Sequence, residues 1–564
     1  MLLHICEIAG AIAIIALSIT VTHGSNISTK IRAFVQPSQK TETKRNQAVS
    51  IGIFISFFIL YAFLITYETD KIPTPYHVDE AGMAYDAINI AKYGIDRYSY
   101  KYPVYFINFG GGQNALYTYL AAIMIKLFGY SIFIIRLPAI ILSLIAAICF
   151  SRLIFKRYGY TASIITMALH CFLPFSIMHS RWALESYLLY PMLIISCTAL
   201  YKAIRTEKTI LFLASGVLLG TTLYSYAISY LLLVLFLALL LPCLIFFHKI
   251  RLKNIIALGT PLALLALPLI LMLLVNNGII DEIRTEYISI PKLPVYRGAN
   301  VSFANIIKNL AFSQNNIFYK ISFTDGMRYN AIPRFGTVYP FSIPFIVSGV
   351  LSCLNSTRRD IKNKNFSLDI LMNLMFLCSL LTSLLIEDIN INRACEIFFP
   401  LIYFLILGIF KIVKNSKKTA WLTAAVYSIL FLFFSGYYYS DRFQNDIRKN
   451  LVFNSIDDYT QAIDFVHKIK TAKTDKIYVI GRSEAYIYTL LAHNTTPYEI
   501  SDPYTMSESL SIGNTEYKFL SYIDWDGIPD DYIYIFRDHM SIPWKMDLMN
   551  FHTKEFNTIK IYYP

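Results

Sequence analysis

Charged side chains are scarce in this chain. Asp, Glu, Lys and Arg together make up 15% of the 564 residues, whereas soluble domains typically contain about 25%. Hydrophobic residues account for 55%. This composition excludes an ordinary soluble domain, and it is typical of a protein whose helices cross a membrane many times.

Cysteine is sparse outside the apolar stretches. The chain has eight cysteines, and none lies in the long polar segments at 68–129, 276–338 and 440–564. A disulfide framework is therefore not expected. No group of Cys and His has the spacing of a metal site, so the sequence assigns no cofactor and leaves only a divalent cation open.

The apolar stretches predict the architecture. A membrane-spanning helix needs roughly 17 to 25 apolar residues, and about twelve stretches approach that length. They lie at 3–22, 51–67, 130–151, 161–178, 187–203, 209–227, 229–247, 254–275, 339–354, 368–386, 396–413 and 419–438. The predicted fold class is an α-helical polytopic membrane protein. Glu7 and the lack of a preceding Lys or Arg favour an anchor helix over a signal peptide at 3–22.

Basic loops predict the orientation, because Lys and Arg in short loops stay cytoplasmic. Such loops occur at 30–45, 152–157, 202–208, 249–253, 358–364 and 411–418. The loops between them are poorer in Lys and Arg. This alternation predicts an outer-face location for 68–129, 179–186, 276–338, 387–394 and 440–564. Basic loops facing anionic lipid also account for much of the net charge of +13, so no nucleic-acid partner is expected.

Three regions follow from this pattern. Residues 1–50 are predicted to form an anchor helix and a basic cytoplasmic loop, and 51–439 the transmembrane domain. Residues 440–564 are more polar and predict a small extracytoplasmic α/β domain, with strands at 476–481, 531–536 and 559–563 and a helix at 484–493.

The first outer segment is amphipathic rather than spanning. Helical spacing of apolar residues predicts interfacial helices over 83–93 and 115–128. Gly110–Gly112 precede the second helix and predict a flexible approach to it. They do not fit a phosphate loop, because no Lys-Ser or Lys-Thr pair follows them.

Two adjacent carboxylates, Asp79 and Glu80, lie near the start of this segment, just outside the predicted span at 51–67. Acids at a membrane surface suggest chemistry there, since a carboxylate can act as a general base. The structural alternative is that both acids cap a helix beginning near Ala81. The sequence favours the catalytic interpretation for Asp79 and leaves both open for Glu80.

The order of motifs resembles the GT-C superfamily of integral-membrane glycosyltransferases, in particular the protein O-mannosyltransferase and aminoarabinose lipid A transferase branch. Asp79-Glu80 looks like the acidic motif of the first outer loop. Residues 127–131 with 136–139 resemble the passage into the next span. Arg181 and Glu185, after Pro174, look like the second outer loop, and Arg393 followed by Pro400 resembles a late element. The resemblance covers roughly residues 50–415.

The sequence departs from that pattern in two places. Many relatives carry Lys-Pro or Pro-Pro directly before the interfacial helix, where this chain has Gln113-Asn114. The nearest match is Lys101-Tyr102-Pro103, upstream. The second acid is Glu185 rather than the commoner Asp. These differences concern the contacts to the donor phosphate more than the class of reaction.

The resemblance implies transfer of a hexose or pentose from a polyprenyl-phosphate donor to a glycan, lipid or protein acceptor at the outer face of the cell membrane, with inversion. It implies Asp79 as the base with Glu80 beside it. Lys101, Arg181 and Arg393 are the candidates for binding the phosphate, and Glu185 belongs to the same site. Membrane lipid is the remaining partner.

Rival interpretations remain open at this point. Arg181 and Glu185 are spaced as a helical i, i+4 ion pair, and Arg136 at a span end is expected to anchor or snorkel. A transporter or flippase of lipid-linked sugar is the alternative function. It predicts ionisable residues in mid-span, whereas here the centres of the spans are almost free of charge.

Overall fold

The computed structural model describes residues 44–74, 76–296, 301–311, 316–448, 456–471, 476–521, 532–537 and 551–564. The predicted span 3–22 lies outside them. The described residues form two compact units, each built from three separate stretches of the chain. The helical unit contains the described residues before Glu68, the stretch Ala139–Leu267 and the described residues of Gly298–Ser440. The mixed unit contains those of Glu68–Pro138, Pro268–Arg297 and Asp441–Pro564.

Long apolar helices dominate the described part of the chain, and nine of them have the length and composition to cross a membrane. These are Asn46–Thr66, Ile132–Tyr158, Glu185–Thr206, Ile228–Phe246, Leu252–Asn276, Pro340–Lys362, Leu368–Leu385, Asn392–Lys414 and Lys417–Tyr438. The predicted polytopic helical fold is confirmed. The predicted spans at 161–178 and 209–227 correspond to shorter helices, α7 (Tyr160–Phe172) and α10 (Thr209–Leu223).

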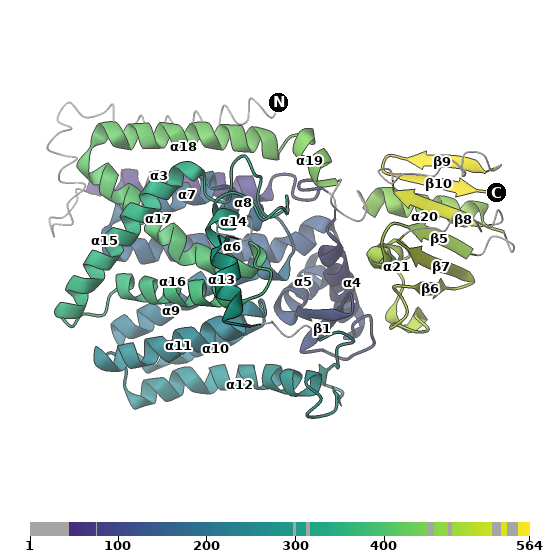
Figure 1. The fold of residues 1–564 in the computed structure, drawn as a ribbon, viewed down its shortest axis with the longest axis horizontal. Coiled ribbons are helices and arrows are strands. Elements are labelled where there is room, and N and C mark those ends of the chain that lie inside the picture. Colours follow the sequence, from purple (N-terminus) through teal and green to yellow (C-terminus); the bar gives the residue numbers. More distant parts are fainter. Residues whose placement is uncertain are drawn as a thin grey trace. The chain divides into compact units, whose positions relative to one another are not determined.

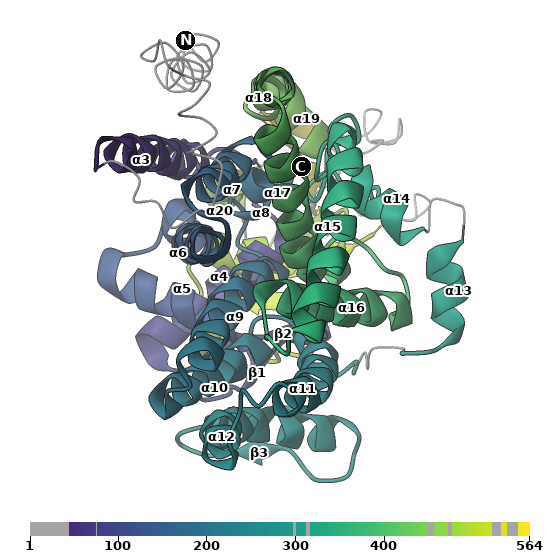
Figure 2. The ribbon, with the colours of Figure 1, turned by 90° about the vertical axis from the view of Figure 1, so that its left-hand side faces the viewer.

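Figures 1 and 2 show the helices of the helical unit. Besides α7 and α10 they are α3 (Lys44–Thr66), α8 (Pro174–His179), α9 (Leu189–Thr206), α11 (Ile228–Phe246), α13 (Ala304–Leu310), α14 (Ile317–Ser322), α15 (Ile343–Lys362), α16 (Leu368–Leu385), α17 (Phe398–Asn415) and α18 (Lys417–Tyr438), with most of α6 (Ile132–Tyr158) and α12 (Leu252–Asn276). Three 3₁₀ turns join them: η1 (Glu185–Leu188), η2 (Pro340–Ser342) and η3 (Asn392–Ile397).

Helices α15 and α17 pack closely side by side (Figure 2). Two glycines permit this approach. A Cβ added at Gly349 would lie 1.8 Å from the carbonyl oxygen of Phe404, and one added at Gly408 would lie 1.9 Å from that of Phe345. Small residues at a helix interface let two backbones approach closely within a membrane protein.

The mixed unit begins with the first outer segment. It contains α4 (Val78–Tyr93), the hairpin β1 (Tyr105–Asn108) to β2 (Gly111–Asn114), and α5 (Ala115–Phe128). The helix predicted from residue 83 therefore starts five residues earlier, and the helix at 115–128 is confirmed. The predicted flexible approach at Gly110–Gly112 is wrong, because these residues form the hairpin. Its two-residue loop, Phe109 and Gly110, has the two positive φ angles of a type I′ turn.

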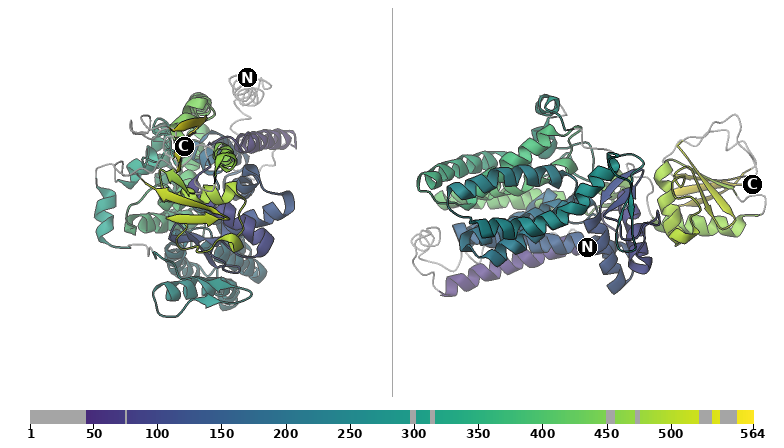
Figure 3. Two further views of the ribbon diagram at one scale, coloured as in Figure 1. Left: turned by 90° about the vertical axis from the view of Figure 1, so that its right-hand side faces the viewer. Right: turned by 90° about the horizontal axis from the view of Figure 1, so that it is seen from below.

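The C-terminal part of the mixed unit is a six-stranded sheet with helices (Figure 3). The strand order is β6-β7-β5-β8-β10-β9, and β5 runs parallel to both neighbours. The strands are β5 (Lys476–Ile480), β6 (Ser509–Ile512), β7 (Thr515–Leu520), β8 (Ile533–Arg537), β9 (His552–Phe556) and β10 (Ile559–Tyr563), and the helices are α19 (Asp441–Arg448), α20 (Ile456–Ile469) and α21 (Tyr486–Ala492). The predicted α/β character is confirmed.

Candidate active site

Glu80 is fixed in a buried ion pair. It lies in the first turn of α4, where its carboxylate accepts a hydrogen bond from the backbone amide of the N-cap residue His77 at 3.1 Å. Both carboxylate oxygens also bind the guanidinium of Arg136, with Nε to Oε1 at 2.9 Å and Nη2 to Oε2 at 2.8 Å. The side chain of Glu80 has no solvent exposure and that of Arg136 is 1% exposed. This geometry favours a structural role for Glu80.

Arg136 connects α4 to the chain that precedes it. Its Nη1 donates to the carbonyl oxygens of Thr69 at 2.7 Å and Pro73 at 3.0 Å. The prediction that Arg136 anchors at the interface or snorkels is therefore wrong. A planar guanidinium can satisfy a carboxylate and two carbonyls together, and Lys could not reproduce this geometry.

Asp79 has a different environment from its neighbour. Its side chain is 45% exposed, and its Oδ1 accepts a hydrogen bond from Nδ2 of Asn108 on β1 at 3.4 Å. Nδ1 of His77 lies 3.6 Å from Oδ2 and accepts the backbone amide of Asp79. Asp79 therefore keeps access to solvent at the N-terminus of a helix.

Gly82 and Arg97 bring Asn108 close to α4. The Arg97 side chain is fully buried and binds the Asp86 carboxylate, with Nη2 to Oδ2 at 2.7 Å, and the carbonyl oxygen of Gly82 at 2.6 Å. A Cβ at Gly82 would lie 2.7 Å from Oδ1 of Asn108 and 2.9 Å from Nη2 of Arg97. Sequence reasoning missed both Asn108 and Arg97, and the glycine two residues after the acids was the available signal.

The C-terminal domain packs on the same segment within the mixed unit. The hydroxyl of Tyr488 on α21 donates to the carbonyl oxygen of Tyr76 at 2.6 Å, and that of Tyr85 donates to the carbonyl oxygen of Thr495 at 2.8 Å. Burial raises the pKa of Tyr488 well above its ordinary value, and the negative charges of Glu80 and Asp79 raise it further. Tyr488 therefore lies near the start of α4.

Residues 282–295 also pack against the first outer segment. The amide of Val104 donates to the carbonyl oxygen of Ser289 at 2.9 Å, beside the short pair β3 (Ile283–Arg284) and β4 (Ser289–Ile290). Lys101, a predicted phosphate-binding residue, forms an ion pair with Glu286. Both side chains are exposed, with 45% for Lys101 and 76% for Glu286, so this pair is weak and open to exchange with another anion.

Arg181 lies in the helical unit and is held by the end of α3. It has no solvent exposure, and its Nη1 and Nη2 donate to the carbonyl oxygens of Leu64 at 2.6 Å and Tyr67 at 2.7 Å. Its guanidinium also lies 5.1 Å from the ring centre of Tyr439. Because α8 ends at His179 and η1 begins at Glu185, Arg181 and Glu185 do not share one helix. Their spacing is therefore not that of an i, i+4 pair on one helix.

Glu185 and Arg393 lie near each other in the helical unit. Glu185 begins η1 and Arg393 lies in η3, and these two turns pack against each other. Cys395, two residues after Arg393, donates from Sγ to the carbonyl oxygen of Ser186 at 3.4 Å.

Arg393 is partly exposed and only partly engaged. Its Nη1 donates to the carbonyl oxygens of Glu387 at 2.8 Å and Asp388 at 3.3 Å, and its Nε and Nη2 make no hydrogen bond to any described residue. The predicted site residues thus fall into two sets: Asp79, Glu80 and Lys101 in the mixed unit, and Arg181, Glu185 and Arg393 in the helical unit. Within the described ranges, no group of three or more His, Cys, Asp and Glu could hold a metal ion.

Comparison with known proteins supports the fold. Residues 114–275, from the end of β2 to α12, match a family model described as dolichyl-phosphate-mannose-protein mannosyltransferase. The chain is similar to the crystal structures of ArnT from Cupriavidus metallidurans, bound to undecaprenyl phosphate (TM-score 0.51) and in the apo state (TM-score 0.53). Each is 8% identical, and each comparison covers 92% of this chain and 98% of ArnT. A search of curated protein sequences found no significant match.

These similarities establish the fold rather than the activity, because the identity is low. The chain has the fold of ArnT over nearly its whole length. The polytopic helical fold that the resemblance implied is therefore confirmed.

Proposed function

We propose that this chain, which has the GT-C fold, is a membrane glycosyltransferase that transfers one sugar from a polyprenyl-phosphate donor to an acceptor at the extracytoplasmic face, with inversion at the anomeric carbon. The ArnT structure with undecaprenyl phosphate supports a lipid-phosphate donor. The family model that matches 114–275 is described as a mannosyltransferase acting on protein.

The observation that carries the proposal is the difference between the two adjacent acids. Glu80 is buried and held by Arg136, whereas the carboxylate of Asp79 is 45% exposed beside it. A base must reach the proton it removes, at hydrogen-bond distance from the acceptor. Only Asp79 of the pair meets this requirement. Its position is fixed by the start of α4, by the ion pair of Glu80 with Arg136 and by the hydrogen bond from Asn108.

The proposed reaction is a single displacement. An acceptor oxygen attacks the anomeric carbon while Asp79 takes its proton, and the bond from the anomeric carbon to the phosphate oxygen breaks. The polyprenyl phosphate leaves with the electron pair of that bond and becomes more negative. A cationic donor directed at the leaving phosphate would therefore lower the barrier.

Arg393 is the best candidate for that donor. Its Nε and Nη2 are available, and a guanidinium can bind two phosphate oxygens at once. Arg181 is less suited, because carbonyl oxygens of Leu64 and Tyr67 occupy two of its nitrogens. Lys101 could contribute a positive charge after leaving Glu286. We assign Glu185, whose turn η1 packs against the turn η3 that contains Arg393, to binding the sugar.

Asp79→Asn tests the proposal directly. The amide keeps the size of the side chain but cannot accept the proton, so we expect transfer to fall by ~10² to 10⁴. The assay uses purified protein and radiolabelled polyprenyl-phosphate sugars, hexoses and a pentose, with membrane extract as the acceptor source. Asp441→Asn is the matched control, since Asp441 is also an exposed acid in the first turn of a helix of the mixed unit.

The control should transfer at the wild-type rate. Wild-type turnover by Asp79→Asn would mean that Asp79 only stabilises the helix start, and the proposed base would be wrong.

A further inference from the structure

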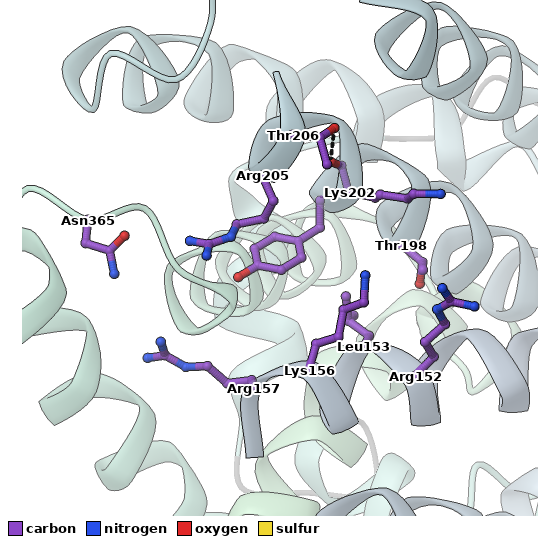
Figure 4. A pocket seen from close by; sticks show the side chains of 10 residues that line it. Arg152, Leu153, Lys156, Arg157, Thr198, Lys202, Arg205, Thr206 and Asn365 are labelled. Atoms are coloured by element: carbon purple, nitrogen blue, oxygen red, sulfur yellow. Dashed lines mark hydrogen bonds between the residues drawn. The ribbon is translucent and has the colours of Figure 1, made fainter. Parts of the chain in front are cut away.

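A basic cavity lies in the helical unit, apart from every residue assigned to sugar transfer. Its volume is about 510 Å³, and it lies between the C-terminal ends of α6 and α9 (Figure 4). Arg152, Lys156 and Arg157 line it from α6, and Lys202 and Arg205 line it from α9. No acid is among its lining residues. The basic loops predict that this end of the helices faces the cytoplasm.

One of the five cations is already neutralised. Nη2 of Arg157 lies 2.7 Å from the carboxylate of Asp369 and 2.9 Å from that of Asp360. Tyr158 and Tyr403 also donate to Asp369, at 2.7 and 2.6 Å. Arg157 therefore belongs to a structural network between helices, and it contributes little uncompensated charge to the cavity.

The other four cations have no such partner. The charged ends of Arg152, Lys156, Lys202 and Arg205 make no hydrogen bond or ion pair with any residue that the structure describes. Each of two helix C-termini supplies roughly half a negative charge. About three positive charges thus remain uncompensated around one cavity, and their mutual repulsion would be relieved by an anion.

The cavity wall also contains an unsatisfied polar group. Oγ1 of Thr198, one of the lining residues labelled in Figure 4, is buried and has no hydrogen-bond partner among the described residues. A buried hydroxyl without a partner costs free energy. A phosphate oxygen in the cavity could accept this hydrogen bond as well as those of the cations.

An apolar stripe leads along α6 to the cavity. Ile141, Ile145 and Ile148 are exposed large hydrophobic residues, and Arg152 continues the same i, i+3, i+4 face. On a membrane protein, such a face contacts acyl chains. The stripe therefore places acyl chains beside the isoleucines and a headgroup at Arg152.

We propose that this cavity binds a phosphate group, supplied by the headgroup of an anionic phospholipid whose acyl chain lies along α6. A basic pocket between transmembrane helices at the cytoplasmic side is a suitable site for such headgroups. Soluble phosphate shares the same chemistry, and the experiment separates the two sources. The proposal does not depend on the sugar-transfer reaction.

The test compares two charge-matched variants of the full chain. The cavity variant is Arg152→Gln, Lys156→Gln, Lys202→Gln and Arg205→Gln. The control variant is Arg358→Gln, Arg359→Gln, Lys362→Gln and Lys364→Gln, in another basic loop, where these side chains are exposed and line no part of the cavity. Each variant removes two Arg and two Lys. Correct insertion is checked first by accessibility of cysteines introduced into the loops.

The first measurement is native mass spectrometry after equilibration with vesicles of phosphatidylcholine containing phosphatidylglycerol. We expect phosphatidylglycerol to stay bound to the wild type and the control, and its affinity to fall at least about tenfold in the cavity variant. Binding of phosphatidylcholine should be the same for all three proteins.

The second measurement is calorimetric titration with inorganic pyrophosphate in a neutral detergent without anionic lipid. Binding to the wild type and the control but not to the cavity variant would identify soluble phosphate as a ligand of the same cavity. If the cavity variant and the control bind phosphatidylglycerol equally well and bind pyrophosphate equally well, the proposal is overturned. The cations would then serve only to orient the chain in the membrane.

Discussion

Replacing Glu80 by Gln should loosen the start of α4. Arg136 is 1% exposed and uses three nitrogens on four acceptors: both oxygens of Glu80 and the carbonyl oxygens of Thr69 and Pro73. A Gln side chain keeps one oxygen that can accept a hydrogen bond, but its NH₂ group would face an N–H donor of Arg136. The guanidinium would then remain buried without a compensating negative charge.

The magnitude follows from the burial of the pair. Breaking a buried ion pair by removing one partner typically costs about 3 to 5 kcal/mol, because the other charge is left uncompensated. Since 1.4 kcal/mol corresponds to a factor of ten, the opening equilibrium should rise by roughly two to three and a half orders of magnitude. The double variant Glu80→Leu with Arg136→Met removes both charges, and it should be far less destabilised than Glu80→Gln.

Hydrogen exchange measures this opening. The amide of Ala81 donates to the carbonyl oxygen of His77 at 2.9 Å, so it reports directly on the first turn of α4. We expect faster exchange in peptides covering 76–90 and unchanged exchange in α17 of the helical unit. Wild-type protection of Ala81 in Glu80→Gln would refute the argument that the ion pair fixes this helix start.

Three further predictions follow from single contacts. Gly408→Ala should lower the unfolding midpoint of the helical unit, because the added Cβ would lie 1.9 Å from the carbonyl oxygen of Phe345. The midpoint is measured with a thiol-reactive dye that reaches the buried Cys353, Cys378 and Cys395 on unfolding. The control Gly436→Ala, whose Cβ would have no atom within 4 Å, should not lower it. Burial, and secondly the charge of Asp86, raise the pKa of Asp96 well above its ordinary value. The folded state then binds a proton that the unfolded chain has lost, so the stability of the fold should fall as pH rises from about 4 toward the raised pKa. Asp96→Asn should remove this dependence, which is measured by comparing unfolding midpoints at about pH 5 and about pH 8. Arg393→Ala should reduce turnover with the lipid donor by ~10² to 10³ while the exposed control Arg334→Ala does not; equal donor kinetics in both would contradict the phosphate contact.

Local properties of the sequence predicted most of the fold. Apolar length located the spans, since the cost of exposing backbone in a bilayer forces helices of fixed minimum length. Helical spacing predicted the bounds of α5, and the apolar run at Lys476–Ile480 gave β5. Strands β6, β7 and β9 were missed. For β9 the reason is that its residues are mostly exposed. An edge strand of this kind has neither the apolar run nor the alternation that identifies a strand.

The contacts that build the site could not be predicted in the same way. Arg136 lies 56 residues from Glu80, and Arg181 lies 117 residues from Leu64. No local pattern specifies which distant acceptor a buried guanidinium will reach. An Arg at a span end has the same appearance whether it snorkels, binds substrate or closes a structural pair. The sequence therefore favoured Asp79 as the base and left the role of Glu80 open, and it could not show that Glu80 pairs with Arg136.

Helix geometry explains why two adjacent acids have such different environments. With 3.6 residues per turn, consecutive side chains on a helix point about 100° apart. When Glu80 faces inward toward Arg136, Asp79 must face away from it, and its side chain reaches solvent at the helix start. A base needs this exposure to exchange its proton, and it also needs a fixed position relative to its substrate. The buried pair of Glu80 and Arg136 supplies the fixed position without closing access to Asp79. An acid placed at residue 81 instead of residue 79 would point in a third direction, so the spacing of the pair sets where the proposed base can act.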